Sequence, residues 1–329
     1  MKWADSMKAI VQKRYGSPDV LELKDIDKPV IDADGVLVSV RAASVNPPDW
    51  AILTGVPYVA RSLYGLRTPR TPVRGTDLAG TVEAVGKDVR RLAIGDEVFG
   101  AGVGAFAEYA IASEETLVPK PAGLTFEQAG AVRMAGLTAL QALRYVGKVQ
   151  PGQKVLINGA GGGIGTFAVQ IARTFGAEVT GVCSASKVDL VQSIGADHVI
   201  DYAQEDFTRG DERYDFILDN VLNHSLSELV RALSRNGMLV PNGGQFWKRW
   251  TASTGVILVK APLLSLVVPQ QIRHVTLKRK REDLLALSEL LETGKVKPVI
   301  GRTYSLGQTP EALGYFGEGH ARGKVVITV

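Results

Sequence analysis

Residues 154–187 read KVLINGAGGGIGTFAVQIARTFGAEVTGVCSASK, and they are the most informative part of this chain. Val155 to Ile157 form a short apolar run, as a buried parallel strand requires. Five glycines follow between Gly159 and Gly165, and apolar residues then recur at helical spacing up to Gly176. Val179 to Cys183 have the pattern of a second strand. The order strand, glycine turn, helix, strand predicts a βαβ unit, whose helix N-terminus suits a pyrophosphate.

The glycine turn departs from the strict G-x-G-x-x-G pattern of dinucleotide-binding proteins. Its nearest fit places Ala160, Gly162 and Gly165 at the three glycine positions. Ala160 is small enough for the tight turn, Gly162 lets the backbone approach phosphates, and Gly165 lets the helix pack closely. Because strand, helix and second strand flank the turn, we predict that it binds a dinucleotide, together with the adjacent Gly163 and Ile164.

The residues after the second strand favour NADPH over NADH. An acid about 20 residues after the glycines would bind a ribose 2′-hydroxyl, but no acid occurs here before Asp189. Ser184 and Lys187 suit a 2′-phosphate instead. The alternative is that Ser184 or Ser186 caps the next helix and that Lys187 is merely solvated.

Composition narrows the class of protein. The 329 residues predict about two domains, and 45% apolar and 22% charged residues are ordinary for a globular enzyme. The single cysteine, Cys183, excludes an intramolecular disulfide and a Cys-rich zinc site. Residues 1–20 lack the apolar core of a signal peptide, so we expect a cytoplasmic protein.

A net charge of +4 is mild, and the basic run between Arg273 and Arg281 could supply most of it. Such a run is typical of a solvated helix start, so we expect no nucleic-acid partner. A patch that contacts an anionic membrane is the alternative reading of this run.

The first part of the chain is rich in predicted strands, including Met7–Val11, Val36–Val40 and Thr81–Val85. We predict a compact, antiparallel, barrel-like domain, to which the last strand, Lys324–Val329, returns. Pro72–Gly80 is predicted as a turn before the strand that begins at Thr81.

Three more strands are predicted after the βαβ unit, and each is followed by a polar or glycine turn. In a doubly wound sheet, ligands lie at the carboxyl ends of the strands, so these turns should face the cofactor. The turn residues are Tyr202, Asn220, Asn242 and Gly243. Helices are predicted over Phe126–Arg144 and Arg281–Glu292.

The chain resembles the medium-chain dehydrogenase/reductase superfamily, and more narrowly its zinc-independent quinone-oxidoreductase branch. The motifs that carry the resemblance are Val45–Trp50, Gly75–Gly80, Ala135–Leu140, the glycine turn and Gly319–Val326. The resemblance implies a doubly wound parallel Rossmann sheet inserted in a β-rich GroES-like catalytic domain. The implied boundaries are 1–124 and 273–329 for the catalytic domain and 125–272 for the Rossmann domain.

The resemblance also bears on zinc. Zinc alcohol dehydrogenases of the superfamily place cysteine, histidine-glutamate and cysteine where this chain has Asn46, Thr76-Asp77 and Met134. Without those ligands no Lewis acid polarises an alcohol oxygen. We therefore expect hydride transfer to an acceptor that is already electrophilic, a quinone or an α,β-unsaturated carbonyl.

The resemblance assigns roles to single residues. Asn46 matches a position near the nicotinamide, although it could simply stabilise the turn beside its prolines. Tyr58 matches a tyrosine that protonates the product in enoyl-thioester reductases, with Tyr64 and water as rivals. The residues implied to bind cofactor are Asn46, Thr138, Lys187, Tyr202, Asn242, Gly243, His320 and Arg322.

Two further expectations remain from the sequence. The apolar stretch Val256–Val268 predicts a homodimer, because an exposed apolar edge of that length would aggregate. The rival functions are an NADPH-binding protein with little turnover, either crystallin-like or partner-binding, and a peripheral membrane-associated reductase.

Overall fold

The computed structural model describes residues 6–58, 61–243 and 268–329. These residues form two compact units. Unit 1 comprises the described residues of 1–135, 279–293 and 298–329, and unit 2 those of 136–278 and 294–297. The stretch Val256–Val268, on which the homodimer prediction rests, lies almost entirely outside the described residues.

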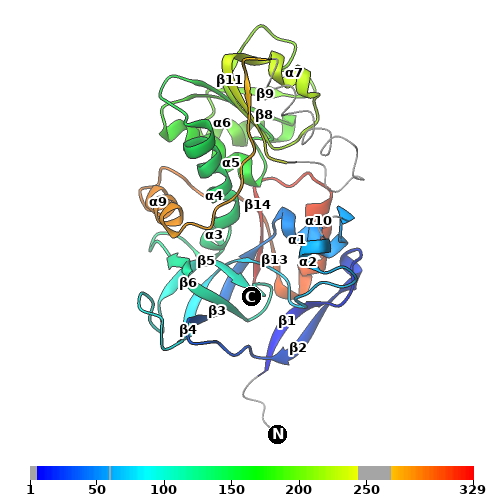
Figure 1. The fold of residues 1–329 in the computed structure, drawn as a ribbon, viewed down its shortest axis with the longest axis vertical. Helices are drawn as coiled ribbons and strands as arrows, with labels where there is room; N and C mark the ends of the chain where they lie inside the picture. The colour runs from blue at the N-terminus through cyan, green and yellow to red at the C-terminus, as the bar shows by residue number, and fades with distance from the viewer. Residues whose placement is uncertain (1–5, 59–60, 244–267) are drawn as a thin grey trace. The chain divides into compact units, whose positions relative to one another are not determined.

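Unit 1 is built on a six-stranded sheet with the strand order β13-β14-β3-β4-β5-β6 (Figure 1). An additional pairing between β3 and β6 closes its antiparallel part into a barrel, as predicted. A separate antiparallel pair joins β1 to β2. The strands are β1 (Ser6–Gln12), β2 (Leu21–Asp27), β3 (Gly35–Ser44), β4 (Asp77–Val85), β5 (Glu97–Val103), β6 (Tyr109–Pro119), β13 (Ile300–Ser305) and β14 (Lys324–Thr328).

The helices of unit 1 surround this sheet. They are α1 (Pro47–Thr54), α2 (Arg61–Tyr64), α3 (Phe126–Gly130), α9 (Arg281–Glu292) and α10 (Thr309–Gly317). Helix α9 has the predicted bounds, and its Leu284, Leu287 and Leu291 are buried. Strand β14 pairs antiparallel with β3, so the end of the chain returns to the first domain as predicted.

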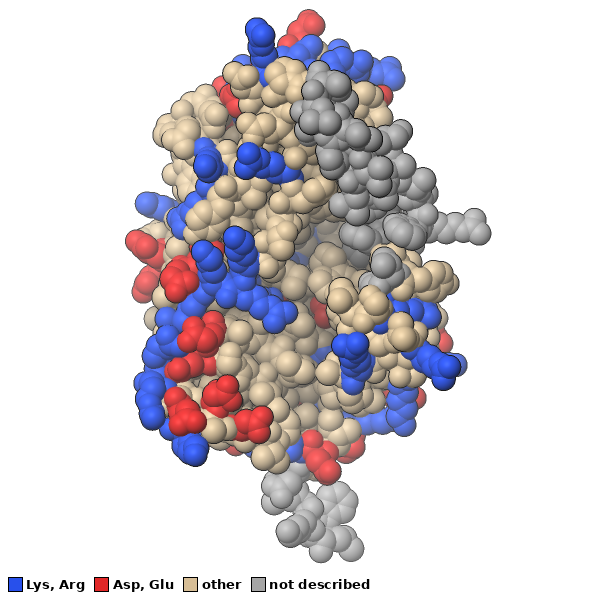
Figure 2. Space-filling view, in the orientation of Figure 1, with Lys and Arg blue, Asp and Glu red and all other residues tan. Residues whose placement is uncertain are grey.

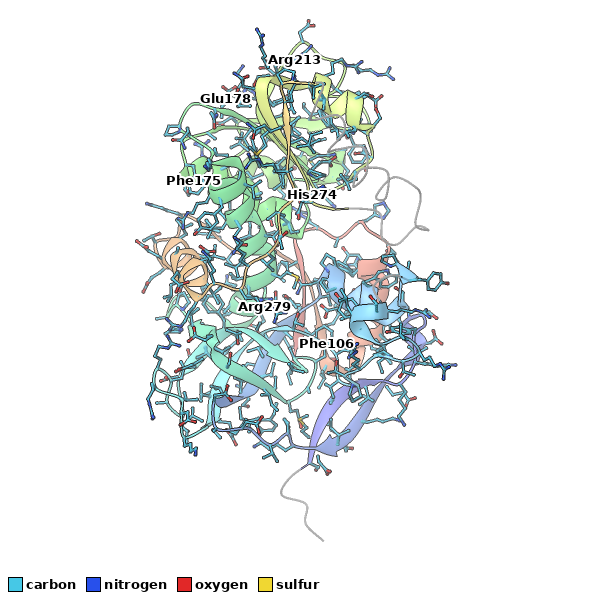
Figure 3. The ribbon with its side chains drawn as sticks, viewed as in Figure 1. Phe106, Phe175, Glu178, Arg213, His274 and Arg279 are labelled. Carbon is cyan, nitrogen blue, oxygen red and sulfur yellow. The ribbon has the colours of Figure 1, made fainter. Side chains whose placement is uncertain are left out.

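Strand β4 begins earlier than the sequence predicted. Asp77 to Gly80 were predicted as part of a turn, but they pair with β3 and β5. The turn itself is shorter and is set by Gly75, which has a φ of +89°. A Cβ on Gly75 would lie 2.6 Å from the backbone nitrogen of Phe106, which is fully buried (Figure 3). Gly75 therefore lets the turn pass close to the backbone of Phe106, and β4 begins two residues later at Asp77.

Unit 2 is a parallel sheet with the order β12-β11-β10-β7-β8-β9, the doubly wound arrangement that the sequence predicted. Its strands are β7 (Lys154–Asn158), β8 (Glu178–Cys183), β9 (His198–Asp201), β10 (Tyr214–Asp219), β11 (Leu233–Pro241) and β12 (Gln271–Ile272). Its helices include α5 (Gly163–Thr174), α6 (Val188–Ser193) and α7 (Leu226–Arg231).

The predicted helix Phe126–Arg144 is broken into three pieces. Helix α3 ends at Gly130, α4 spans Arg133–Gln141, and a π-helix spans Ala142–Gly147. Helix α3 packs on β3 and β4 and belongs to unit 1, whose first segment ends at residue 135. The break in the helix therefore lies next to the junction of the two units. The domain boundaries given above remain a prediction.

The surface charge of unit 1 is mixed in sign. Figure 2 shows acidic and basic side chains next to one another on its visible face. Among the ion pairs of unit 1, Arg91 lies 3.4 Å from the carboxylate of Glu114. The basic run continues from β12 into α9, and Arg273, Lys278 and Arg279 are exposed along it. Figure 3 labels His274 and Arg279 in this segment.

Candidate functional site

The glycine turn of unit 2, which joins β7 to α5, is tight and hydrogen-bonded. Gly159 has a φ of +80°, and the N–H groups of Gly159 and Ala160 both donate to the carbonyl of Val182, at 3.0 and 2.9 Å. A Cβ on Gly165 would lie 2.1 Å from the carbonyl oxygen of Gly159, so only glycine allows α5 to start here. The first intrahelical bond runs from Thr166 to Gly162.

Three N–H groups at the start of α5 have no partner within the helix. They belong to Gly163, Ile164 and Gly165, and the first turn of any helix leaves such donors. Together with the helix dipole they form the feature that binds a pyrophosphate in βαβ proteins.

Lys187 lies across this turn. A Cβ built on Gly161 would meet the Cδ and Cβ atoms of Lys187 at 2.7 and 3.0 Å, so the lysine stem covers the Gly161 backbone. Ser184 precedes the short 3-10 helix Ala185–Lys187. The N-cap alternative would require a capping hydrogen bond from its side chain, and the structure shows none. Tyr202 is 56% exposed and follows β9, and its N–H donates to Cys183 at 3.1 Å. The residues predicted to recognise a 2′-phosphate therefore follow the carboxyl ends of the two adjacent strands β8 and β9.

Asparagine side chains connect the turns after β7, β10 and β11. Asn242 donates to the side-chain oxygen of Asn220 at 2.8 Å, and Asn220 donates to the carbonyl of Asn158 at 3.2 Å. A Cβ on Gly243 would lie 2.2 Å from the carbonyl oxygen of Asn220, which explains the glycine there. These turns lie at the carboxyl ends of adjacent parallel strands, where doubly wound sheets bind ligands.

Asp219 was not singled out from the sequence, although it ends β10 at this edge. Its Oδ1 accepts hydrogen bonds from Asn158, Val221 and Leu222, at 2.9, 3.0 and 3.0 Å. Its buried Oδ2 has no hydrogen-bond partner among the described residues. Burial raises the pKa of Asp219, and the hydrogen bonds oppose that shift. The signal that could have identified it is an acid at the end of an otherwise apolar strand.

Unit 1 contains a second polar site, centred on Asn46. Asn46 is 1% exposed and precedes α1, where its N–H donates to the carboxylate of Asp49 at 2.8 Å. The Nζ of Lys324 lies 2.6 Å from Asn46 Oδ1, and Asn46 Nδ2 donates to the carbonyl of Ser44 at 3.1 Å. Burial raises the pKa of Asp49 to about 7, with the charge of Asp77 acting in the same direction.

Asn46, Asp77 and Met134, which the family resemblance equates with zinc-ligand positions, all lie in unit 1. Strand pairing places Ser44 opposite Asp77, and Asp77 Oδ2 accepts the backbone N–H of Met134 at 2.8 Å. Asp77 also lies 3.4 Å from Arg133, with both side chains buried. Within the described ranges, no group of three or more His, Cys, Asp or Glu residues could hold a metal ion. The site is thus made of amide, carboxylate and cationic groups.

The two candidate proton donors differ in setting. Tyr58 is 71% exposed, and its ring stacks on the guanidinium of Arg61 at 4.7 Å from the ring centre. Tyr64 is half-buried, and burial raises the pKa of its phenol, with the charge of Asp49 contributing. Tyr64 therefore lies within electrostatic reach of the Asn46 site.

The remaining predicted residues occupy separate places. Thr138 is buried in α4 of unit 2. His320 and Arg322 are exposed in the loop before β14 of unit 1.

Comparisons with known proteins identify the family. Residues 32–122 match the model described as "Alcohol dehydrogenase GroES-like domain", and residues 194–327 match "Zinc-binding dehydrogenase". A mouse protein named "NAD(P)H oxidoreductase RTN4IP1, mitochondrial" is 33% identical, with 98% of this chain and 89% of the mouse protein covered. The tomato "2-methylene-furan-3-one reductase" is also 33% identical, over 98% of this chain and 79% of its own length. The solved quinone oxidoreductase of Coxiella burnetii superimposes with a TM-score of 0.85 at 30% identity, covering 98% of this chain and 99% of that one.

The chain belongs to the medium-chain dehydrogenase/reductase family, in its quinone-oxidoreductase-like branch. The predicted fold, a Rossmann sheet combined with a GroES-like domain, is confirmed. The predicted class of enzyme, a nicotinamide-dependent oxidoreductase, is confirmed as well. In the part of the chain that the structure describes, no helix is both long and apolar enough to cross a membrane.

Proposed function

We propose that this protein is an NADPH-dependent reductase that transfers hydride to a quinone or an α,β-unsaturated carbonyl without zinc. The observation that supports the proposal is the contact of Lys324 Nζ with Asn46 Oδ1 at 2.6 Å, because the resemblance equates Asn46 with a zinc-ligand position of metal-dependent relatives. Relatives named as quinone and enone reductases support the class of acceptor.

The preference for NADPH rests on the edge of the sheet in unit 2. Lys187 lies over the glycine turn, and the chain has no acid between β8 and Asp189 to bind a ribose 2′-hydroxyl. Ser184 and Tyr202 flank the lysine at the ends of adjacent strands. We propose that these three side chains bind the 2′-phosphate.

The chemistry of the acceptor fits a site without metal. NADPH supplies a hydride when bound, and an enone takes that hydride at its β-carbon while the electron pair of its double bond moves to the carbonyl oxygen. A proton then completes the reduction at the α-carbon. The protein must stabilise the negative oxygen, and preorganised N–H donors do this well in a buried site. We propose that Asn46 provides such a donor.

We propose Tyr64 rather than Tyr58 as the proton source. The side chain of Tyr64 is half-buried, whereas that of Tyr58 is 71% exposed, and Asp49 lies within electrostatic reach of Tyr64. Phenylalanine at each position separates the two: Tyr64→Phe should lower kcat, and Tyr58→Phe should leave it unchanged.

The proposed zinc independence has a physical basis in unit 1. A divalent cation beside Asn46 would meet the ammonium of Lys324, whose Nζ also donates to the carbonyl of Val45 at 3.2 Å. Like charges at such short range repel strongly in a buried site. This proposal differs from the name of one matching family, "Zinc-binding dehydrogenase", which refers to zinc.

The oligomeric state, the partners and the location of the protein remain predictions. We expect a homodimer, no nucleic-acid partner and a cytoplasmic location, although the mouse relative carries the word mitochondrial in its name. Light scattering tests the first, since a 35.2 kDa species alone would contradict it.

The acceptor screen tests the proposed function. NADPH absorbance is followed with simple quinones, enals and saturated alcohols as reactants. Consumption of NADPH with quinones or enals, and no reduction of NADP⁺ by alcohols, is expected. Tight NADPH binding without turnover on any acceptor would instead favour the cofactor-binding protein without catalysis.

A further inference from the structure

Lys324 is an unusual residue for the place that it occupies. It begins β14, it is 4% exposed, and its backbone N–H donates to the carbonyl of Val299 at 2.8 Å. Strand register explains its position, because Val326 pairs with Ser44 and the residue two earlier therefore faces Asn46. Lysine is seldom fully buried unless its charge is paired, so this ammonium needs an explanation.

The ammonium fixes the orientation of the Asn46 carboxamide. A lysine side chain only donates hydrogen bonds, so the Asn46 atom that lies 2.6 Å from Nζ must be the oxygen. The amide nitrogen then points the other way, and one of its two N–H groups donates to Ser44. A carboxamide nitrogen has a second N–H, which this orientation offers to an acceptor.

Two further contacts hold the rest of the residue. Asp49 accepts the backbone N–H of Asn46, and Lys324 also donates to the carbonyl of Val45. The charges of Asp77 and Asp49 favour the ammonium form, while burial acts in the opposite direction and lowers the pKa of Lys324 overall. A cation bonded to the amide oxygen polarises the carboxamide and strengthens its N–H as a donor.

We propose that Lys324 is a positioning residue, which orients and polarises Asn46 so that its second Nδ2–H group is presented to the oxygen that becomes negative during hydride transfer. The inference rests on the proposed function, in which Asn46 stabilises that oxygen. In addition, Lys324 sets the orientation of the Asn46 amide and part of its strength as a hydrogen-bond donor.

A double-mutant cycle tests whether the lysine acts through the asparagine. Lys324→Met should lower kcat with an enal about 10- to 100-fold, the scale of losing a preorganised charge-assisted donor, with little change in the Kd for NADPH. In an Asn46→Ala background the same substitution should change kcat less than twofold. A full loss in both backgrounds would overturn the proposal, and so would a folded Lys324→Met enzyme with normal kcat.

Lys120→Met is the matched control. Lys120 is also in unit 1, its side chain is 5% exposed, and it pairs with Glu97 at 3.0 Å. It is therefore a buried, paired lysine whose ammonium contacts Glu97 and the carbonyls of Pro121 and Leu124. Lys120→Met should lower the thermal midpoint without lowering kcat. Equal loss of kcat in Lys324→Met and Lys120→Met would mean that each buried lysine affects activity only by stabilising unit 1, and it would overturn the proposal.

A second measurement does not depend on turnover. Selective ¹⁵N-asparagine labelling reports the side-chain amide of Asn46 by NMR, assigned by its loss in Asn46→Ala. Lys324→Met should shift that signal and Lys120→Met should not. An unmoved signal in Lys324→Met would overturn the proposal even if the enzyme were active. If Lys324→Met clearly shifted the signal but the wild-type protein reduced no acceptor, the contact between Lys324 and Asn46 would be supported and the proposed function rejected.

Discussion

Asp49 is the residue whose ionisation should be easiest to detect. Its carboxyl is buried, its folded pKa is about 7, and its ordinary value is 3.8. Between these two values the folded protein binds a proton that the unfolded chain releases, so this group makes folding less favourable as pH rises. The effect is complete near pH 7 and amounts to about 4 kcal/mol at most.

The variant Asp49→Asn isolates this effect. Its amide oxygen can still accept the Asn46 N–H, but it does not ionise. From pH 5 to pH 8 the free energy of unfolding of the wild-type protein should fall relative to that of Asp49→Asn, as measured by urea denaturation. Parallel curves for the two proteins over this range would mean that Asp49 keeps an ordinary pKa.

Lys187 should control the choice of cofactor. A hydrogen bond to a charged group contributes roughly 1.5–3 kcal/mol, and about 1.4 kcal/mol is tenfold in affinity. Lys187→Ala should therefore weaken NADPH binding about 10- to 100-fold and barely change NADH binding, as measured by cofactor fluorescence. Wild-type binding of NADPH should also weaken with salt more steeply than that of NADH. Equal losses for both cofactors in Lys187→Ala would assign the lysine to the fold or to the pyrophosphate.

Single residues of both candidate sites can be predicted from the sequence, but the hydrogen bonds between them cannot. Lys187, Ser184 and Tyr202 were predicted together, and they do lie at one edge. Asn46 was also singled out, but Lys324 was read only as part of a motif and a strand. Nothing in the local sequence indicates that residues 278 positions apart share a hydrogen bond. Such contacts depend on strand register, which local patterns do not determine.

The glycine turn and the start of α5 leave no room for a side chain at Gly165. Gly165→Ala would place a Cβ 2.1 Å from the carbonyl oxygen of Gly159 and 2.7 Å from the Cα of Ala160. Both are backbone atoms, so the helix start must move away from the turn. Gly165→Ala should therefore lower the thermal midpoint and weaken NADPH and NADH to a similar degree.

Gly210→Ala is the control for that prediction. Gly210 is also in unit 2, and a Cβ there would approach only the backbone nitrogen of Glu212, at 4.0 Å. This variant should bind both cofactors like the wild type. Wild-type cofactor affinity in Gly165→Ala would show that the start of α5 is not held by this contact.

Periodic patterns predicted most elements, and the errors fall where packing overrides pattern. The strands of unit 2 and helix α9 were predicted because apolar runs and a leucine stripe define them well. The start of β4 was missed because Gly75 shortens the turn before it, and Phe106, far along the chain, requires that glycine. The break between α3 and α4 was missed because both halves are helical in pattern, and only packing of α3 on β3 and β4 separates them.

At the scale of the whole molecule, sequence motifs and comparisons agree on the family. The doubly wound order of unit 2 and the barrel of unit 1 both follow from motif order. The first segment of unit 1 ends at residue 135, which places α3 in unit 1 together with the strands that it covers.

The whole protein should need no zinc. Untagged protein purified without added metal should contain well below one zinc per chain, and a strong chelator should leave NADPH-dependent turnover unchanged. The reason is the Lys324 ammonium beside Asn46, which opposes a second cation there. Stoichiometric zinc together with chelator-sensitive turnover would refute this prediction.

Hydride transfer itself can be followed with isotope. The protein is incubated with an enal and NADPH that carries deuterium on both hydrogens of its nicotinamide C4, and the product is analysed by mass spectrometry and NMR. We expect one deuterium per molecule at the β-carbon, and an unlabelled α-carbon that takes its proton from water or from an exchangeable group. A product without deuterium at the β-carbon, or deuterium on the carbonyl carbon of an alcohol product, would contradict the assignment of this protein as a quinone or enone reductase.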